Sequence, residues 1–462
     1  MPRFLRCVAG DKMKVLHVPF CFAPDPSGGT EVYVANLARD LHGLGVDAMV
    51  AAPSETSRTY TIDDFRVRRF AINKITEVCQ LYGRGDELAA TEFATILDEE
   101  RPDVVHLHAF TAAVSLRVVE VTKARGIPVV FTYHTPTVSC QRGTLLLWGK
   151  TFCDGKLDVG RCAGCTLNGL GMYRPVAALV GQLSPVAGRW VRNRGLQGGI
   201  WTALRMSELI SMRHAAFREM ATKVDLIVAV CNWVKNVLLL NDIPAAKVSI
   251  SRHGINWATD TIAPVPSSAH RLRDEVRLAF LGRLDPTKGL HVLIKAFRTA
   301  PSNLSLDVYG VVQSSANAAY QKEMLNLASG NPRISFHKPI GSREVVSHLR
   351  QFDFLTVPSQ WLETGPMVVL EAFAAGIPVI GWKLGGMAEI VRDGIDGLLI
   401  EPDATDGWSE TLRRVADDAK LRAQLKAGVR PPRTSREVAR EMLTLYESLL
   451  RSPSPRQTVH DA

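Results

Sequence analysis

The sequence predicts an α/β protein with two domains, each built on a parallel sheet covered by helices. Three observations support this prediction: the length of 462 residues, a regular alternation of short apolar runs with helical patterns, and a Pro-, Ser- and Ala-rich stretch just past the middle. A chain of this length exceeds what one hydrophobic core usually fills, so two domains are expected.

The first series of elements lies in the N-terminal half, to which we assign residues 13–260. The apolar run "KVLHVPF" precedes the helical pattern "EVYVANLARDLHGLG", "DVVHLHAF" precedes "AVSLRVVEVTKARG", and "PVVFTYH" follows. Strands that alternate with helices in this way favour a parallel sheet with helices on both faces.

The second series begins at "VRLAFLGRL" (276–284) and continues through "SLDVYG", "ISFHKPI", "DFLTVPS" and "PVIGWKLGG", within a domain at 271–432. The stretch at 258–270 is predicted to be the linker between the two domains. An amphipathic helix is expected over 433–451, followed by a disordered tail at 452–462. Two Rossmann-like domains facing each other bind ligands at the carboxyl ends of their strands, inside the cleft.

Residues 136–222 interrupt the first series, because they show no clear strand. They contain four cysteines in the order C-x12-C-x8-C-x2-C, namely Cys140, Cys153, Cys162 and Cys165. Three interpretations stay open: a structural zinc ion held by four thiolates in a segment too short to build its own core, free or redox-active thiols, and an iron–sulfur cluster. Disulfides are not expected in a cytosolic protein.

A basic stretch that bears tryptophan, "GRWVRNRGLQGGIWTALRM", follows the cysteines. It has two interpretations: contact with anionic lipid or a lipid-linked acceptor, or a pair of helices on the domain surface. The net charge of +9 suits phosphorylated ligands or an anionic membrane. Nucleic acid is not an expected partner, since none of the usual binding signatures is present.

No apolar run is long enough for a membrane-spanning helix, and the N-terminus lacks the apolar segment of a signal peptide. We therefore expect a cytoplasmic protein, with attachment to the inner face of the membrane left open.

Two carboxylates stand in the segment "WLETGPMVVLEAFAAGIPVI" (361–380). Pro366 is predicted to occupy the first helical position, where a missing N–H group is tolerated. The free amides of Met367 and Val368 would then point out of the helix end, which creates a site for a phosphate. A surface helix with two solvated carboxylates is the alternative for this segment alone.

Glu371 follows these amides by one helical turn on the same face, and Glu363 lies in the loop before the helix. The two glutamates would therefore flank a bound diphosphate. A glycosidase needs its two carboxylates on either side of one scissile bond, and nothing in this segment requires that.

Cations and glycines occur at other predicted strand ends. In "FLGRLDPTKGL", Arg283 ends a strand and Lys288 follows after a turn, a pairing that suits a departing pyrophosphate. In "GGTE", Gly28 and Gly29 open the first helix and allow close approach of a ligand.

Together these residues resemble the retaining GT-B glycosyltransferases of family 4 (group 1), in a subset that carries a Cys-rich insertion. The resemblance covers about residues 13–450. Its most specific part is Arg283 and Lys288 combined with the two glutamates spaced E-x7-E and "GGMAEIVRDGIDGLLI". The chain departs from the family where Gly365-Pro366 follow the first glutamate, because many members have Phe-Gly there.

The resemblance also implies roles for single residues. Arg283 and Lys288 would bind the donor diphosphate, which Gly29 approaches from the other domain. Glu371 would bind the ribose hydroxyls, and Glu363 would contact the donor sugar.

His134 matches the family's cleft histidine near that sugar, although the residues alone also allow a buried histidine at a strand end. His106 and His108 are expected to be structural.

The implied activity is transfer of a hexosyl group, with retention, from a nucleotide-diphosphate sugar to a saccharide or lipid-linked glycan, as in surface or exopolysaccharide synthesis. The chain has no D-x-D motif, so no catalytic cofactor is expected. The rival interpretations are a nucleotide-sugar epimerase or a phosphorylase of the same fold, and a non-catalytic protein that binds nucleotide sugars.

Overall fold

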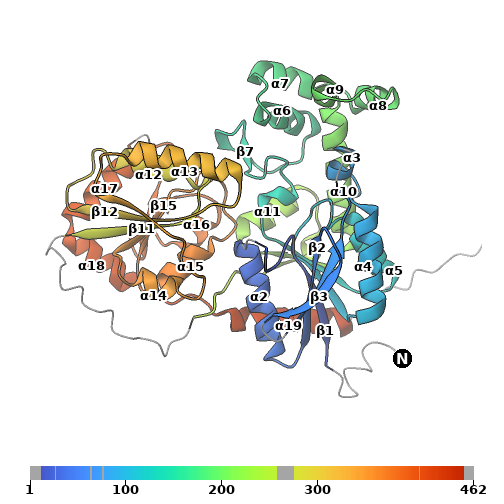
Figure 1. The fold of residues 1–462 in the computed structure, drawn as a ribbon, viewed down its shortest axis with the longest axis horizontal. Coiled ribbons are helices and arrows are strands. Elements are labelled where there is room, and N and C mark those ends of the chain that lie inside the picture. The colour runs from blue at the N-terminus through green and yellow to red at the C-terminus, as the bar shows by residue number, and fades with distance from the viewer. Residues whose placement is uncertain are drawn as a thin grey trace, which may run out of the picture.

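The computed structural model describes residues 12–25, 28–62, 65–74, 78–257, 275–404 and 406–451. The predicted linker at 258–270 and the predicted tail at 452–462 lie outside these ranges. Two α/β bodies lie side by side, and an arm of short helices projects from the N-terminal body (Figure 1). Within the described ranges, no helix is both long and apolar enough to cross a bilayer.

The N-terminal domain contains an eight-stranded sheet in the order β10-β9-β6-β5-β1-β2-β4-β3, parallel except where β3 pairs with β4. The strands are β1 (Lys14–Val18), β2 (Asp47–Ser54), β3 (Arg58–Ile62), β4 (Phe65–Ala71), β5 (Val104–Leu107), β6 (Val129–Tyr133), β9 (Leu226–Ala229) and β10 (Val248–Ile250). The accompanying helices are α2 (Gly29–His42), α3 (Val78–Tyr82), α4 (Glu87–Glu100), α5 (Leu116–Ala124), α10 (Met206–Lys223) and α11 (Asn232–Leu240). Two short 3-10 turns also belong here, η1 (Pro136–Val138) and η2 (Ala245–Lys247). The predicted strands of the first series are confirmed.

The C-terminal domain contains a six-stranded parallel sheet in the order β13-β12-β11-β14-β15-β16. Its strands are β11 (Val276–Arg283), β12 (Leu304–Val311), β13 (Ile334–His337), β14 (Phe354–Val357), β15 (Val379–Trp382) and β16 (Gly397–Ile400). Its helices are η3 (Pro286–Lys288), α12 (Leu290–Ala296), α13 (Ser315–Ala328), α14 (Val345–Leu349), α15 (Met367–Ala374), α16 (Gly385–Ile390), α17 (Gly407–Asp417) and α18 (Ala419–Gly428). All five predicted strands of the second series are present.

The arm consists of a hairpin and four helices: β7 (Leu146–Leu147), β8 (Thr151–Phe152), α6 (Val159–Gly169), α7 (Arg174–Gly181), α8 (Pro185–Asn193) and α9 (Gly199–Leu204). The expectation of no strand over 136–222 was wrong for β7 and β8, which are too short to show an alternating pattern. Helix α10, inside the same range, instead packs Phe217 and Met220 into the core of the large sheet. The interruption therefore ends where α10 begins.

The final helix, α19 (Ser435–Arg451), leaves the C-terminal domain and packs on the N-terminal one. Met442 and Tyr446 are fully buried there, in a cluster with Leu37 of α2. The hydroxyl group of Tyr446 lies 2.6 Å from Nδ1 of His106. The end of the chain is thus part of the first domain's core.

Candidate active site

Helix α15 begins one residue later than predicted. Pro366 has φ −65° and ψ 113°, so its backbone is extended and it caps the helix instead of occupying its first position. Its carbonyl oxygen accepts a hydrogen bond from the amide of Val369 at 3.0 Å. The amides of Met367 and Val368 have no acceptor among the described residues, which leaves two donors at a positive helix end. The anion site predicted there keeps the same two amides.

The N-terminus of α2, from the other domain, meets this helix end. A Cβ atom added to Gly29 would lie 3.5 Å from Cγ of Met367, so the two helix ends lie close together. The amide of Gly28 donates to Oε2 of Glu31 at 2.7 Å, which caps α2. Two helix N-termini, one from each domain, thus lie near one another, and helix N-termini favour anionic ligands.

Lys288 is held in place by a tight turn. The carboxylate of Asp285 accepts hydrogen bonds from the amide and the hydroxyl of Thr287, at 2.9 and 2.5 Å. Gly289 has φ +71°, and a Cβ atom there would fall 1.9 Å from the carbonyl oxygen of Pro358. Only glycine fits, because the turn presses against the end of β14.

Lys288 and Glu363 form an ion pair of 2.5 Å between Nζ and Oε1. The same oxygen accepts hydrogen bonds from Ser359 Oγ at 2.9 Å and Trp361 Nε1 at 2.8 Å. One carboxylate oxygen of the buried Glu363 is therefore saturated by protein donors, while Oε2 has no partner in the described ranges. Arg283 is exposed at the end of β11 and likewise pairs with no described group.

The backbone around Glu363 is fixed by close packing against α16. Its carbonyl oxygen accepts hydrogen bonds from the amide of Gly386 at 2.6 Å and from Trp233 Nε1 at 3.0 Å. Gly385 has φ +48°, and a Cβ atom there would lie 2.7 Å from the same oxygen. This contact explains the paired glycines of "KLGGMAEIV".

Glu371 lies one turn into α15 on an apolar helix. Burial raises the pKa of its carboxyl group to about 7. No hydrogen bond or ion pair to this carboxyl group is present in the part of the chain that the structure describes. It is therefore free to accept hydrogen bonds from ligand hydroxyl groups.

His134 belongs to a chain of four buried imidazoles. His17 Nδ1 lies 3.1 Å from His108 Nε2, and His108 Nδ1 lies 3.0 Å from His134 Nε2. His134 Nδ1 in turn lies 3.3 Å from His253 Nε2. The ring of His253, the last of the four, contacts the loop before α15, because its Nδ1 lies 3.1 Å from the carbonyl oxygen of Gly365.

This chain has only one set of tautomers if all four rings are neutral. A carbonyl oxygen only accepts, so His253 carries its proton on Nδ1 and accepts at Nε2. His134, His108 and His17 must then each carry the proton on Nδ1 as well. The bare Nε2 of His17 ends the chain, buried and without a partner.

Burial lowers the pKa values of these rings, which supports the neutral forms. The pKa falls to about 3 for His17 and about 4 for His253, and lies well below the usual value for His108 and His134. Both nitrogens of His134 are engaged within the chain of imidazoles. Its predicted contact with a sugar stays a prediction.

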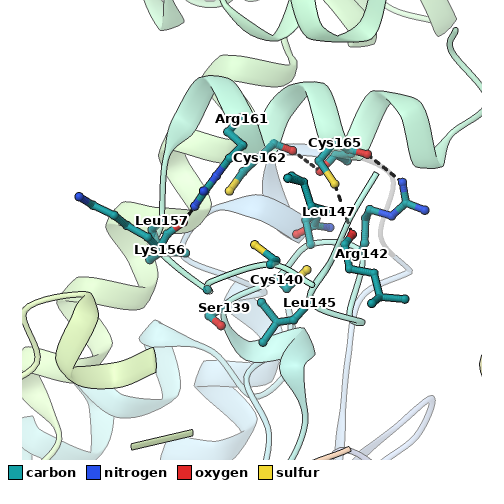
Figure 2. Close-up of a pocket in the computed structure, with 15 residues that line it drawn as sticks. Ser139, Cys140, Arg142, Leu145, Leu147, Lys156, Leu157, Arg161, Cys162 and Cys165 are labelled. Carbon is teal, nitrogen blue, oxygen red and sulfur yellow. Dashed lines mark hydrogen bonds between the residues drawn. The ribbon is translucent and has the colours of Figure 1, made fainter. Parts of the chain in front are cut away.

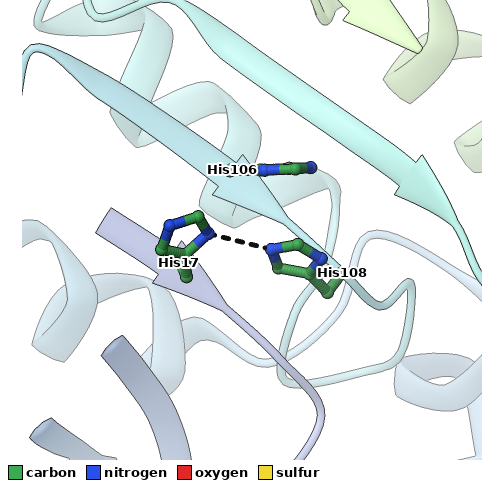
Figure 3. Close-up of side chains that lie close together, drawn as sticks. All are labelled: His17, His106 and His108. Carbon is green, nitrogen blue, oxygen red and sulfur yellow. Dashed lines mark hydrogen bonds between the residues drawn. The ribbon is translucent and has the colours of Figure 1, made fainter. Parts of the chain in front are cut away.

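The nitrogens of His17, His106 and His108 lie within 4.8 Å of one another (Figure 3). Hydrogen bonds account for this proximity. His106 bonds to Tyr446 through Nδ1 and to Thr132 Oγ1 through Nε2, at 2.7 Å for the latter. Both ring nitrogens of His106 are used in these hydrogen bonds, so the cluster lacks the free nitrogen lone pairs that a metal ion needs.

The four predicted thiols line one pocket in the arm. Burial raises the pKa of Cys162 to about 12 and that of Cys153 above its usual value. None of the described cysteines forms a disulfide.

The patterns missed several residues that the structure brings to the site. Ser359 and Trp361 could have been found, since polar side chains between a strand and a helix N-terminus face the cleft in this fold. His253 and Trp233 carried no signal, because each acts through a contact with the other domain.

Both halves of the chain match known families. Residues 28–254 match the family model "Glycosyl transferase 4-like domain", and residues 267–430 match "Glycosyl transferases group 1".

Two curated relatives show the extent of the similarity. The D-inositol 3-phosphate glycosyltransferase of Xylanimonas cellulosilytica is 31% identical over 216 residues, which is 43% of this chain and 51% of the relative. The lipopolysaccharide 1,2-N-acetylglucosaminetransferase of Salmonella typhimurium is 31% identical over 226 residues, 46% of this chain and 58% of the relative. The chain thus matches little more than half the length of these relatives.

Solved structures show the same fold. HepE of Anabaena, in complex with UDP and glucose, has a TM-score of 0.61 at 15% identity, over 94% of this chain and 100% of that one. A putative UDP-N-acetylglucosamine 2-epimerase from Listeria monocytogenes has a TM-score of 0.54 at 12% identity, over 96% and 98%. The chain therefore joins a glycosyltransferase 4-like domain to a group 1 glycosyltransferase domain, on the GT-B fold of its solved neighbours.

Proposed function

We propose that this protein transfers a hexosyl group from a nucleotide-diphosphate sugar to a saccharide or lipid-linked glycan, with retention at the anomeric carbon. The observation that carries the proposal is the meeting of two helix N-termini, one from each domain, next to Lys288 and Glu363. The matches to two glycosyltransferase families support it.

The donor's diphosphate would lie at the helix end that Met367 begins, with Arg283 and Lys288 neutralising its charge. Glu371 would accept hydrogen bonds from the ribose, and the free Oε2 of Glu363 would face the sugar. In the reaction, the bond from the anomeric carbon to the diphosphate oxygen breaks. A bond to the acceptor oxygen forms on the same face, and the acceptor's proton passes to the departing phosphate.

A screen of the purified protein against UDP-, GDP- and ADP-sugars tests this proposal. We expect slow donor hydrolysis without acceptor, and its loss in Lys288→Ala while Lys420→Ala, at an exposed position on α18, keeps it. NMR of the transferred sugar reports the anomeric configuration, and inversion would refute the retaining mechanism. Exchange of configuration at a ring carbon without transfer would favour an epimerase. Donor binding without turnover would favour a non-catalytic protein.

We further propose that the acceptor is lipid-linked and that the arm docks on an anionic bilayer at the inner face of the membrane. Between residues 170 and 200 of the arm, eight large apolar side chains are exposed, and we call them the apolar arm surface: Leu170, Tyr173, Val176, Leu179, Leu183, Val186, Trp190 and Ile200. Leu179 is 75% exposed and Trp190 53%. Isolated exposed apolar residues are ordinary, but this concentration in one segment is not.

The chain segment that carries this surface has only positive side chains among its charged residues. Between Asp158 and Glu208 the chain has six arginines and no acidic residue. The guanidinium group of Arg194 lies 4.3 Å from the ring centre of Trp190, in the pairing of aromatic and cation found at membrane interfaces. Apolar side chains that would enter the acyl boundary, with cations beside them for lipid phosphates, fit anionic lipid better than a neutral protein partner.

Sedimentation with vesicles tests the docking. We expect binding to vesicles that contain phosphatidylglycerol, weak binding to pure phosphatidylcholine, and loss of binding in Leu179→Ser. Leu325→Ser, on α13 with 45% exposure, is the matched control and should still bind. If Leu179→Ser instead abolishes self-association, the surface joins two copies of the chain and the membrane proposal is wrong.

A further inference from the structure

The four thiols of the arm line one small pocket, which we call the thiol pocket. Its volume is about 30 Å³, room for one ion or one to two water molecules. The side chains of Cys140, Cys162 and Cys165 face it beneath α6 (Figure 2).

The thiols come from places where short segments supply metal ligands. Cys140 lies in the turn after η1, where its amide donates to the carbonyl oxygen of Pro136 at 2.8 Å. Cys153 directly follows the β7–β8 hairpin, and Cys162 and Cys165 lie three residues apart on the first turns of α6. A C-x2-C pair on one helix face, opposed by a hairpin, is an arrangement from which four thiols can close around one ion.

Backbone amide groups are directed at these sulfur atoms. The amide of Trp148 donates to Sγ of Cys165 at 3.2 Å. Backbone hydrogen bonds from Gly155 and Asp158 likewise reach Cys153 and Cys162. Donors of this kind stabilise metal-bound thiolates, because each lowers the negative charge on a sulfur.

Basic residues are among those that line the same pocket, although the Lys156 side chain points away from the cysteines in Figure 2. Arg142, Lys156 and Arg161 all line it, and Arg161 interacts electrostatically with Cys153 and Cys162. A zinc ion held by four thiolates carries a net charge of about −2, which needs such compensation. Part of the charge of Arg161 is shared with Asp154, at 2.7 Å.

We propose that the thiol pocket binds one zinc ion as four thiolates and that this ion holds the arm together. On binding, four S–H bonds lose their protons to solvent and four Zn–S bonds form. Sulfur atoms around zinc lie about 3.8 Å apart. Among the described residues, the possible ligand atoms that already lie within 4.8 Å of one another belong to the three histidines and not to the four cysteines. Zinc binding must therefore draw the four sulfur atoms closer together.

The contraction would matter for the rest of the arm. Helix α6 packs closely on α7: a Cβ atom on Gly164 would lie 2.9 Å from the carbonyl oxygen of Ala177, and one on Gly181 would lie 2.4 Å from the amide nitrogen of Gly164. The apolar cluster beneath the arm is small, with seven buried residues, of which only three belong to the arm's own helices. A bound ion would therefore supply stability that this core does not.

Metal analysis of the full chain, purified under reducing conditions, tests the proposal. We expect about one zinc per chain, its loss in Cys162→Ser, and its retention in Cys79→Ser, which alters a thiol outside the pocket. Removal of zinc with a chelator should speed proteolysis within 140–205, and added Zn²⁺ should restore resistance and release protons.

Four outcomes would overturn the proposal. They are no metal together with no uptake of Zn²⁺ by chelator-treated protein, iron with inorganic sulfide, a disulfide between pocket cysteines, and equal zinc content in wild type and Cys162→Ser. Because metal content and proteolysis do not require a donor or acceptor, these results are independent of the proposed activity.

Discussion

Replacing Glu371 by glutamine should stabilise the donor-free protein at high pH while weakening donor binding. The carboxyl group titrates near 4.5 in the unfolded chain and near 7 in the folded one, because burial disfavours its charge. As pH rises from 4.5, the unfolded state loses this proton first, so stability falls until the folded group ionises near pH 7. The difference between the two pKa values corresponds to a loss of about 3 kcal/mol in the free energy of unfolding, at 1.36 kcal/mol per pKa unit.

Glutamine has no such titration, so the difference in unfolding free energy between Glu371→Gln and wild type should grow by about 3 kcal/mol between pH 4.5 and pH 9. Urea unfolding of both proteins, without ligand, measures this difference at each pH. Glu410→Gln, at an exposed position on α17, is the matched control and should show no such trend. A difference for Glu371→Gln that stays constant across this range would refute the argument from burial.

The same substitution should weaken binding of the nucleoside diphosphate at pH 8. Hydrogen bonds from hydroxyl groups to a charged acceptor are worth about 1.5–3 kcal/mol, so the dissociation constant should rise roughly 10- to 100-fold. In wild type, affinity should increase as pH rises through about 7, since the carboxylate accepts more hydrogen bonds than the acid does. Unchanged affinity in the glutamine variant, measured by calorimetry, would separate Glu371 from the donor.

Three further predictions concern the loop and its supports. Trp361→Phe removes one of three donors to Glu363, and kcat/KM for the best donor should fall at least tenfold, because a bond to a charged acceptor is worth about 1.5–3 kcal/mol. His253→Phe removes the acceptor of His134, so ¹⁵N NMR of the His17, His108 and His134 rings should show a mixture of tautomers where in wild type these rings show only Nδ1–H. An unchanged spectrum would contradict the tautomer assignment. Gly385→Ala places a methyl group 2.7 Å from a carbonyl oxygen at positive φ and should destabilise the protein by at least about 2 kcal/mol in urea unfolding.

The sequence was sufficient to predict those helices and strands that depend only on residues near one another along the chain. Strand β11 follows from an apolar run, and the end of α15 follows from Gly376, whose φ is +77°. The start of α15 was displaced by one residue, because Pro fits both the cap and the first helical position and only ψ distinguishes them. Chain order alone cannot show that Glu363 shares one oxygen among three protein donors.

Contacts between the domains fix the position of the loop at residues 363–365, just before α15. Three consecutive loop residues each bond to the N-terminal domain: Glu363 through Trp233, Thr364 through the carbonyl oxygen of His134 at 2.5 Å, and Gly365 through His253. At about 0.5–1.5 kcal/mol each, these three bonds together contribute roughly 1.5–4.5 kcal/mol.

That sum is of the order that separates two conformations of one protein, so these three bonds are strong enough to hold the loop and weak enough to release it. Opening of the cleft would free the carbonyl oxygen of Gly365 and remove the acceptor that sets all four histidine tautomers. The position of Glu363 and the protonation pattern around His134 are then two consequences of the same closure. Glu363 of one domain is thus held in place by the other domain, an arrangement that no motif within either half of the chain encodes.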